Sequence, residues 1–374
     1  MKVVFALFFA LLAVSGCTGE EADLTNSAPA VMLVPVDSVG IEIGDEDYVF
    51  GVISAVDFLQ DGRLLILDSS RQTLRLFSLE GEYITEYGGT GEAPGEFLSP
   101  RDIAVLRGGV VVVTDPRAAK FEFFHADSGH IGALQGFSPR APFSIAAAGD
   151  IIVGHLALFD RDQGRTGEAL SGWGMDSPVP RVVFTEEWSR FDPSEMAARF
   201  MDPDPPLQVT DDRVFYAPLD WERHRIIVFN PDGSQAGVWS RPGFVPVRKT
   251  PDQIAEEIAF YEQRRQQMLG MGMGGRGMAA AEYAPSEYYF AVASLGLDET
   301  GRLWARRGSG EEPVFDLFDT STGDYLGMAM GPGSMGSWTF VITPFGIAAY
   351  EEDPVDYPRV VLLDYADPER EESQ

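Results

Sequence analysis

The chain has 374 residues, 45% of them hydrophobic, and its 58 acidic against 28 basic residues give a formal net charge of −30 at pH 7. This charge argues against nucleic acid as a partner, because nucleic-acid binding depends on neutralising phosphates with Lys and Arg. The single cysteine, Cys17, excludes an intrachain disulfide, so a large hydrophobic core must supply the stability.

The N-terminal residues have the pattern of an export signal. Lys2 is followed by an apolar run over residues 3–14 and then by Ser15-Gly16-Cys17. The run is shorter than the roughly 20 apolar residues of a membrane-spanning helix. The ending resembles a bacterial lipobox, so we expect residues 1–16 to be a lipoprotein signal peptide and Cys17 to be lipidated; the alternative is an ordinary signal with a chance cysteine. Because Thr18 and not Asp follows the cysteine, we expect an exported lipoprotein of the outer membrane, facing the periplasm or the cell surface.

The rest of the chain is dominated by repeated strand signals. Residues 17–30 are polar and aperiodic and predict a flexible tether, after which a turn followed by a short apolar run occurs six times. Most copies continue as a hairpin, for example FEFFHADSGHIGAL, in which a turn glycine joins two strands. An inner strand precedes each copy, such as residues 53–58, 102–106 and 292–297. Six four-stranded antiparallel units predict an all-β, six-bladed β-propeller over residues 31–365.

Two parts of this ring are less regular. Blade six has three strands near the C-terminus, at residues 338–343, 346–350 and 360–365, so we expect the isolated strand at residues 31–36 to supply the fourth and close the ring. Blade three is expected to have central strands near 150–158 and 168–173, separated by the polar stretch DRDQGRTG, and an outer strand near 180–185. Residues 366–374 form an acidic tail.

Helices are expected only between blades. Asp192-Pro193-Ser194-Glu195 combines a capping residue, a proline at the first helical position and a glutamate at the third, and Thr250-Pro251-Asp252-Gln253 repeats this pattern. The second helix carries an apolar stripe at helical spacing, made of Ile254, Ile258, Tyr261 and Met268. It opens a helical, Met/Gly-rich insertion over residues 250–281.

The stretch YGGTGEAPGEFLSP, residues 87–100, has glycine spacing close to that of a phosphate-binding loop. However, Glu92 and Glu96 would repel phosphate, and Pro94 and Pro100 prevent a helix from beginning there. We therefore expect a connector from blade one to blade two, in which Phe97 fills the seam between the blades and Arg101 and Asp102 reach the mouth of the ring.

These residues resemble the NHL-type six-bladed propellers, whose blades carry a loop of the form G-x-G-x-x-P-G-x-F-x-x-P before each inner strand. Residues 89–100 run in the same way into Ile103-Ala104-Val105, and Asp115 ends the next strand as in the family. The segment MLVPVDSVGIEIGDEDYVFG is like the opening of lipid-anchored bacterial members. The resemblance implies the fold but no single function, because this fold hosts hydrolases, lyases and proteins that only bind partners.

Several chemistries have weak support. Lactonase-like relatives hold calcium with oxygen ligands that include asparagines, and this chain has only Asn26 and Asn230. Lyase relatives need several converging histidines, and the four present, His125, His130, His155 and His224, are expected at the surface. No serine lies in a nucleophile-elbow sequence. The methionines of the insertion, Met268, Met271, Met273 and Met278, could bind copper, or they could form an adaptable apolar loop.

Arginines and aromatic residues gather in the loops expected on one face of the ring. Loops joining second to third strands carry Arg71, Arg117, Arg223 and Arg307, and Arg101 and Arg140 precede inner strands. An arginine-lined mouth on an acidic protein would attract anions, unless each arginine pairs with a neighbouring acid such as Asp68, Asp115 or Asp220. The candidate ligand-binding face comprises Arg71, Arg101, Asp102, Arg117, Arg140, Trp221, Arg223, His224, Tyr288 and Tyr289.

The sequence therefore favours a lipid-anchored binding module that is not an enzyme and needs no cofactor or metal. We expect its partners to be the membrane, through Cys17, and a protein or small anionic ligand at this face. The alternative is a hydrolase or lyase with a metal-dependent site in the central channel. That alternative predicts three or more polar ligands converging on one point in the channel.

Overall fold

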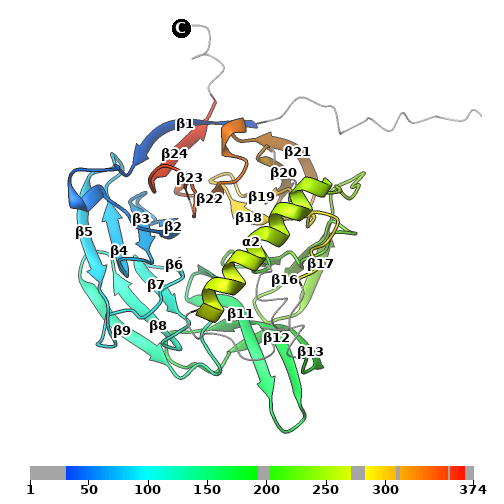
Figure 1. The fold of residues 1–374 in the computed structure, drawn as a ribbon, viewed down its shortest axis with the longest axis horizontal. Coiled ribbons are helices and arrows are strands. Elements are labelled where there is room, and N and C mark those ends of the chain that lie inside the picture. The colour runs from blue at the N-terminus through cyan, green and yellow to red at the C-terminus, as the bar shows by residue number, and fades with distance from the viewer. Residues whose placement is uncertain (1–30, 193–202, 271–282, 309–311, 353, 367–374) are drawn as a thin grey trace, which may run out of the picture.

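The structure is a computed structural model that describes residues 31–192, 203–270, 283–308, 312–352 and 354–366. Strands of alternating or continuous apolar residues form blades of four antiparallel strands arranged around a central axis, which confirms the predicted propeller (Figure 1). The innermost strands β2, β6, β10, β14, β18 and β22 contact one another in this order, and β22 contacts β2, so the ring is closed.

Each blade runs from an innermost strand at the channel to an outermost strand at the rim. In this order, blade one contains β2 (Ile53–Phe58), β3 (Leu64–Asp68), β4 (Thr73–Phe77) and β5 (Tyr83–Gly88). Blade two contains β6 (Asp102–Leu106), β7 (Val110–Asp115), β8 (Lys120–His125) and β9 (Gly129–Gln135). Blade three contains β10 (Ile145–Ala148), β11 (Ile151–Asp160), β12 (Arg165–Trp173) and β13 (Val182–Arg190). Blade four contains β14 (Leu207–Val209), β15 (Val214–Tyr216), β16 (Ile226–Phe229) and β17 (Gln235–Trp239). Blade five contains β18 (Ser294–Leu297), β19 (Arg302–Arg306), β20 (Val314–Asp319) and β21 (Tyr325–Met330). Blade six contains β22 (Thr339–Thr343), β23 (Gly346–Tyr350), β24 (Val360–Tyr365) and β1 (Val31–Val39).

The N-terminal strand closes the ring, as predicted. β1 pairs antiparallel with β24, from Leu33 opposite Tyr365 to Val39 opposite Val360, and it is longer than expected. Its first two residues also pair with β21, so blades five and six share one eight-stranded sheet. Gly40 ends the strand at a φ of 132°, where a Cβ atom would lie 2.8 Å from the Pro358 carbonyl oxygen. Only glycine allows this close approach of the two chain ends without strain.

The core is divided among the seams between blades. Six clusters of buried apolar side chains each join two neighbouring blades of the described structure. Phe97 is fully buried between blades one and two and packs against Phe124, with ring centroids 5.7 Å apart. The expectation that Phe97 fills this seam is therefore confirmed.

Blade three differs from the sequence prediction. Its central strands are longer than expected, and the two strands pair without interruption from Ile152 opposite Trp173 to Asp160 opposite Arg165. Residues 161–164 of the polar stretch form the tip of a hairpin, where Gly164 adopts a φ of 60° and turns the chain, and the rest of the stretch pairs in β11 and β12. The outer strand runs to Arg190, and this three-stranded arm projects beyond the rim of the ring (Figure 1).

One helix of the described residues is long. α2 (Pro251–Gly270) begins with the expected capping box, since Gln253 N–H donates to Thr250 Oγ1 at 3.3 Å and Thr250 N–H donates to Gln253 Oε1 at 2.8 Å. The helix crosses in front of the ring (Figure 1). The helix expected after Asp192 lies outside the described residues. No helix in the described ranges is long and apolar enough to cross a membrane.

Candidate functional site

The central feature of the site is a pair of arginines around one phenyl ring. Arg101 precedes β6, and Arg140 and Phe143 precede β10, so three side chains from neighbouring connectors meet at one mouth of the channel. The guanidinium carbons of Arg140 and Arg101 lie 4.3 Å and 5.8 Å from the centroid of the Phe143 ring. Neither guanidinium makes an ion pair with a carboxylate of the described residues. We call these three residues the arginine pair site.

Two carboxyl groups lie on the inner strands below this site. Asp102 accepts hydrogen bonds from Ile103 N–H at 2.9 Å and from Ile145 N–H at 2.8 Å, so it links blades two and three. Desolvation by burial raises the pKa of Asp102 from 3.8 to about 7, against the opposing effect of these hydrogen bonds. The pKa of Asp57 is also raised to about 7, first by burial and then by the charge of Asp102. Both groups can therefore exchange a proton near neutral pH.

Acids act on the arginine pair site only at a distance. Burial lowers the pKa of the Arg140 guanidinium, and the negative charges of Asp204 and Glu168 partly oppose this effect. Burial raises the pKa of Asp204, and the positive charges of Arg101 and Arg140 oppose this increase. Arg140 is thus held in a poorly solvated position, whereas Arg101 is exposed, and neither contacts a carboxylate of the described residues. A sequence pattern did not reveal Phe143 or Asp204, because neither belongs to the repeated blade unit.

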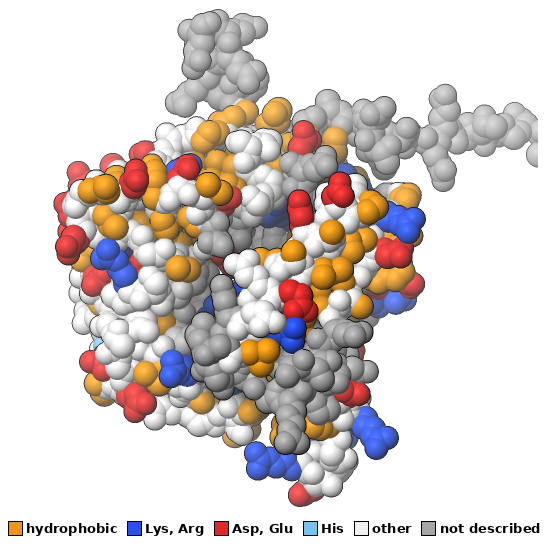
Figure 2. All heavy atoms as spheres, viewed as in Figure 1, with side chains coloured by type: hydrophobic (Ala, Val, Ile, Leu, Met, Phe, Trp, Pro, Cys, Tyr) orange, Lys and Arg blue, Asp and Glu red, His pale blue; other side chains and the backbone are white. Residues whose placement is uncertain are grey.

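The insertion between β17 and β18 opens beside the loops of blade four. Its two ends pair with each other, since Lys249 N–H donates to the Glu287 carbonyl and Tyr289 N–H donates to the Val247 carbonyl. Trp221, from blade four, stacks on Tyr288 with ring centroids 4.8 Å apart and an interplanar angle of 8°. Figure 2 shows this face hollowed beside α2. Two aromatic residues of the candidate face are therefore in direct contact.

The described side-chain contacts hold the helix to the two ends of its own insertion. Tyr261 is buried and stacks on Tyr283, with centroids 4.5 Å apart. Lys249 forms an ion pair of 2.6 Å with Glu257 and lies 5.5 Å from the centroid of the Tyr289 ring. Ile258 is exposed, so the expected apolar stripe is not a buried face along its full length. The Met268 side chain and the other three methionines considered for copper lie outside what the structure describes.

The other candidate arginines are mostly neutralised locally. Arg71 pairs with Asp68 at 3.9 Å and Arg223 pairs with Asp220 at 3.3 Å. Arg307 pairs with buried Asp316 at 2.7 Å. Arg117 is exposed and makes no ion pair with the described residues; Asp115, its expected partner, accepts instead from the backbone N–H groups of Leu98, Ser99 and Ala118. The alternative of local pairing therefore holds for Arg71, Arg223 and Arg307.

His224 is not on the ligand-binding face. It is 2% exposed, in the seam between blades four and five, where it lies against Phe244 and Phe318. Burial lowers its pKa to about 4, although the charge of Asp316, 3.6 Å away, opposes this effect. The prediction of a surface histidine was wrong because the residue preceding β16 points between the blades.

The remaining histidines do not converge either. Burial lowers the pKa of His155 to about 4, and its ring lies 5.3 Å from that of Tyr216. His130 bonds to the buried Glu122 at 2.7 Å. Among the described residues, no group of three or more His, Cys, Asp or Glu side chains is arranged to hold a metal ion.

The loop at residues 87–100 is a closed connector. Gly91 N–H donates to the Phe97 carbonyl, Phe97 N–H donates to the Gly89 carbonyl, and Ala93 N–H donates to Glu96 Oε2. Lys120 Nζ donates to the Glu96 carbonyl at 2.8 Å, which ties the loop to blade two. These amides are used within the protein, so they are not available to cradle a phosphate.

Comparison with known proteins gives the fold. The family model described as a 6-bladed beta-propeller matches residues 44–133, which contain the strands of blade one and most of blade two. No curated protein matches the sequence. A solved structure from Bacteroides fragilis NCTC 9343 is 14% identical and covers 91% of this chain and 97% of its own, with a TM-score of 0.47. Virginiamycin B lyase from Staphylococcus aureus is also 14% identical and covers 87% of this chain and 99% of its own, with a TM-score of 0.43. At these identities and TM-scores, the solved structures carry no argument about activity.

Proposed function

We propose that this propeller is a binding module without catalytic activity, which holds a small anionic ligand at the arginine pair site. The observation that carries the proposal is the position of Arg101 and Arg140 around Phe143, with no carboxylate of the described residues in ion-pair contact. A guanidinium is planar, and its N–H groups suit a carboxylate or phosphate; packing on an aromatic ring fixes the orientation of this plane. An incoming anion would replace the missing counter-ion.

The surroundings favour an anion over a protein surface as the first ligand. The site lies where the connectors before the inner strands β6 and β10 meet. Burial lowers the pKa of the Arg140 guanidinium, which means that the charged form is poorly solvated and would gain from a bound anion. Elsewhere the protein is strongly acidic, so its field concentrates anions only where arginines gather.

The experiment is calorimetric titration with citrate, inorganic phosphate and sulfate at low ionic strength. Arg101→Gln and Arg140→Gln should each lower the affinity for the most tightly bound of these anions at least tenfold. Arg107→Gln is the matched control, because Arg107 follows the opposite end of β6 and already pairs with Asp211 at 3.1 Å. Binding of none of the three anions at millimolar concentration, or equal weakening by Arg107→Gln, would contradict the proposal.

A second part of the proposal is the attachment to the membrane. Cys17, at the end of the expected signal peptide, would carry the lipid and hold the propeller at the outer membrane. Cys17→Ser should move the protein from the membrane fraction to the soluble fraction of the cell envelope. If the variant stayed in the membrane fraction, the lipid anchor would be refuted.

The enzymatic alternative can be tested on the same preparation. A metal-dependent hydrolase or lyase would retain calcium or zinc in a fixed ratio to the chain. Elemental analysis of the purified protein should find less than one-tenth of an equivalent of either metal. A stoichiometric metal would replace the binding-module proposal with the enzymatic one.

A further inference from the structure

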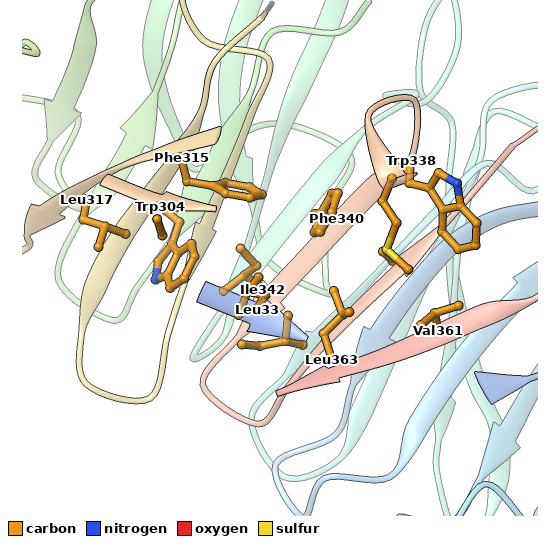
Figure 3. Close-up of a cluster of buried hydrophobic side chains, with 13 residues drawn as sticks. Leu33, Trp304, Phe315, Leu317, Trp338, Phe340, Ile342, Val361 and Leu363 are labelled. Atoms are coloured by element: carbon orange, nitrogen blue, oxygen red, sulfur yellow. The ribbon is translucent and has the colours of Figure 1, made fainter. Parts of the chain in front are cut away.

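The structure contains a second concave site that is separate from the channel. A cleft of about 610 Å³ opens in blade six between β1 and two loops, and it is lined by Asp37 and Ser38 on one side and by Trp338, Glu351 and Arg359 on the other. A recess of about 60 Å³ continues past Arg359 to Tyr357. The main cleft has the size of typical small-molecule sites. Figure 3 shows Trp338 and Val361, which both line it, at one end of the buried cluster between blades five and six.

The charges that line the cleft disfavour an anion. Asp37, Glu351 and Asp356 contribute three carboxylates, against the single guanidinium of Arg359. That guanidinium already lies 3.7 Å from Asp356. An anionic ligand would meet an excess of like charge, so the cleft does not share the ligand class of the arginine pair site.

The aromatic side chains disfavour a cation. The guanidinium carbon of Arg359 lies 5.7 Å from the centroid of the Trp338 ring and 5.0 Å from that of the Tyr357 ring. These are the positions where an organic cation would gain most from the two rings. The protein's own arginine occupies them.

The remaining lining groups offer both donors and acceptors. Glu351 accepts a hydrogen bond of 2.8 Å from Ser337 Oγ, and Asp37 accepts one of 2.7 Å from Ser38 N–H, so each carboxylate keeps free lone pairs. The Arg359 side chain is 29% exposed and keeps N–H groups for a ligand. Val36, Met335 and Val361 add apolar surface. Hydroxyl groups both donate to carboxylates and accept from guanidinium, and the C–H face of a sugar ring suits an apolar wall.

We propose that the blade-six cleft binds an uncharged, hydroxyl-rich ligand of the size of a mono- or disaccharide. The ligand donates hydroxyl hydrogen bonds to Glu351 and Asp37 and accepts from Arg359. Because the cleft is walled by β1 and by the loops that precede β22 and β24, a bound saccharide also connects the two ends of the propeller chain. Binding therefore raises the melting temperature as the saccharide concentration increases.

The test is calorimetric titration of the full mature chain with cellobiose and N,N′-diacetylchitobiose, together with a thermal melt at each concentration. Glu351→Gln and Arg359→Lys should each lower the affinity for the more tightly bound saccharide at least fivefold. Glu351→Gln removes the negative charge of an acceptor, and Arg359→Lys removes the planar donor. Glu352→Gln, an exposed neighbour outside the cleft, should leave the affinity unchanged. Arg140→Gln should also leave it unchanged, which separates this site from the channel mouth.

Three outcomes would overturn the proposal. The first is the absence of binding by both disaccharides at about 20 mM, a concentration at which a millimolar affinity would already show. The second is binding that Glu351→Gln and Arg359→Lys leave unchanged. The third is binding of spermidine, included as a cationic probe, in place of the saccharides.

Discussion

The hydroxyl of Tyr350 donates a hydrogen bond of 3.0 Å to the backbone carbonyl of Ser54, across 296 positions of the sequence. Tyr350 ends β23 of blade six, and Ser54 lies on β2 of blade one. The bond therefore joins the last blade to the first, in the seam that also contains Val39 of the N-terminal strand. Tyr350 is 4% exposed, so water cannot replace its hydroxyl as a partner.

Tyr350→Phe should lower the free energy of unfolding by about 1 kcal/mol, because it removes one buried hydrogen bond and leaves the packing of the ring intact. Urea unfolding followed by tryptophan fluorescence measures the change. Tyr83→Phe is the control, since the Tyr83 hydroxyl makes no hydrogen bond with the described residues; it should change stability by less than about 0.5 kcal/mol. Equal effects of the two substitutions would contradict the role of the bond in ring closure.

A buried ion pair fixes the connector between blades one and two. Lys120 Nζ lies 2.5 Å from Glu122 Oε1, and the two side chains are 3% and 0% exposed. Lys120→Met leaves the carboxylate of Glu122 without its cation and should destabilise the protein by about 3 kcal/mol. The double variant Lys120→Met/Glu122→Gln removes both charges and should recover at least about 1 kcal/mol of that loss, because burying one lone charge costs more than burying none.

The same urea experiment can refute this reasoning. If the double variant were as unstable as Lys120→Met alone, the loss would come from the hydrogen bond of Lys120 to the Glu96 carbonyl and not from the unpaired charge. Making both variants in a His130→Gln background removes the other neighbour of Glu122 that can carry a positive charge.

The channel carboxyls predict a specific dependence of stability on pH. Since the pKa of Asp102 is about 7 in the folded protein and 3.8 is its ordinary value, the folded state binds the proton more tightly than the unfolded state. The stability contributed by the protonated group is complete below about pH 4 and decreases as the pH rises to about 7. Asp102→Asn cannot titrate there, so wild type should lose stability relative to this variant across that range.

Urea unfolding at four pH values between 4.5 and 7.5 measures this difference. The substitution also removes the charge that raises the pKa of Asp57, so the Asp57 carboxyl should titrate at lower pH in the variant, which carbon-13 NMR of the side chain can follow. A stability difference that is constant with pH would show that Asp102 is already ionised throughout.

Competition at the arginine pair site gives a further prediction. Asp204 opposes ligand binding, because its charge acts on both Arg101 and Arg140. Asp204→Asn should raise the affinity for the most tightly bound anion by a factor of about 3 to 10, which is the effect expected from removing one nearby negative charge. Calorimetry measures the affinity, and the control is Asp211→Asn, in the turn between β14 and β15, where Asp211 pairs with Arg107. Weaker binding by Asp204→Asn would mean that Asp204 is part of the ligand site.

The blade strands could be predicted from the sequence because each depends on local signals. The strands at residues 53–58, 102–106, 346–350 and 360–365 coincide with their predicted bounds, since a turn residue marks where each begins or ends. Blade three was predicted poorly because Arg165, Thr166 and Gly167 are polar or small, although they pair in β12. Side-chain polarity does not report pairing in an arm that projects into solvent.

The sites could be predicted only in part, since they depend on contacts between distant segments. Arg101 and Arg140 were identified from their place before inner strands, but Phe143, which organises them, was not. The blade-six cleft joins residues 35–38 to the loops before β22 and β24, and no local pattern links these segments. Burial of His224 between two aromatic rings likewise follows from the packing of blades, which the sequence does not display.

The packing of α2 against the C-terminal end of its insertion can be tested through Tyr261. This side chain is 2% exposed and stacks on Tyr283, whereas most other residues of the helix are exposed or half-buried. Tyr261→Ala should remove the main packing contact, so amide hydrogen exchange over residues 251–265 should become at least tenfold faster. The propeller itself does not depend on this contact, and the exchange of the inner strands should stay unchanged.

Tyr261→Phe is the matched control. It keeps the aromatic ring and removes a hydroxyl that has no hydrogen-bond partner in the described structure, so protection of the helix should stay equal or increase. Slow exchange of α2 in Tyr261→Ala would show that the polar contacts of Glu257, with Lys249 and with the Tyr283 hydroxyl, hold the helix in place.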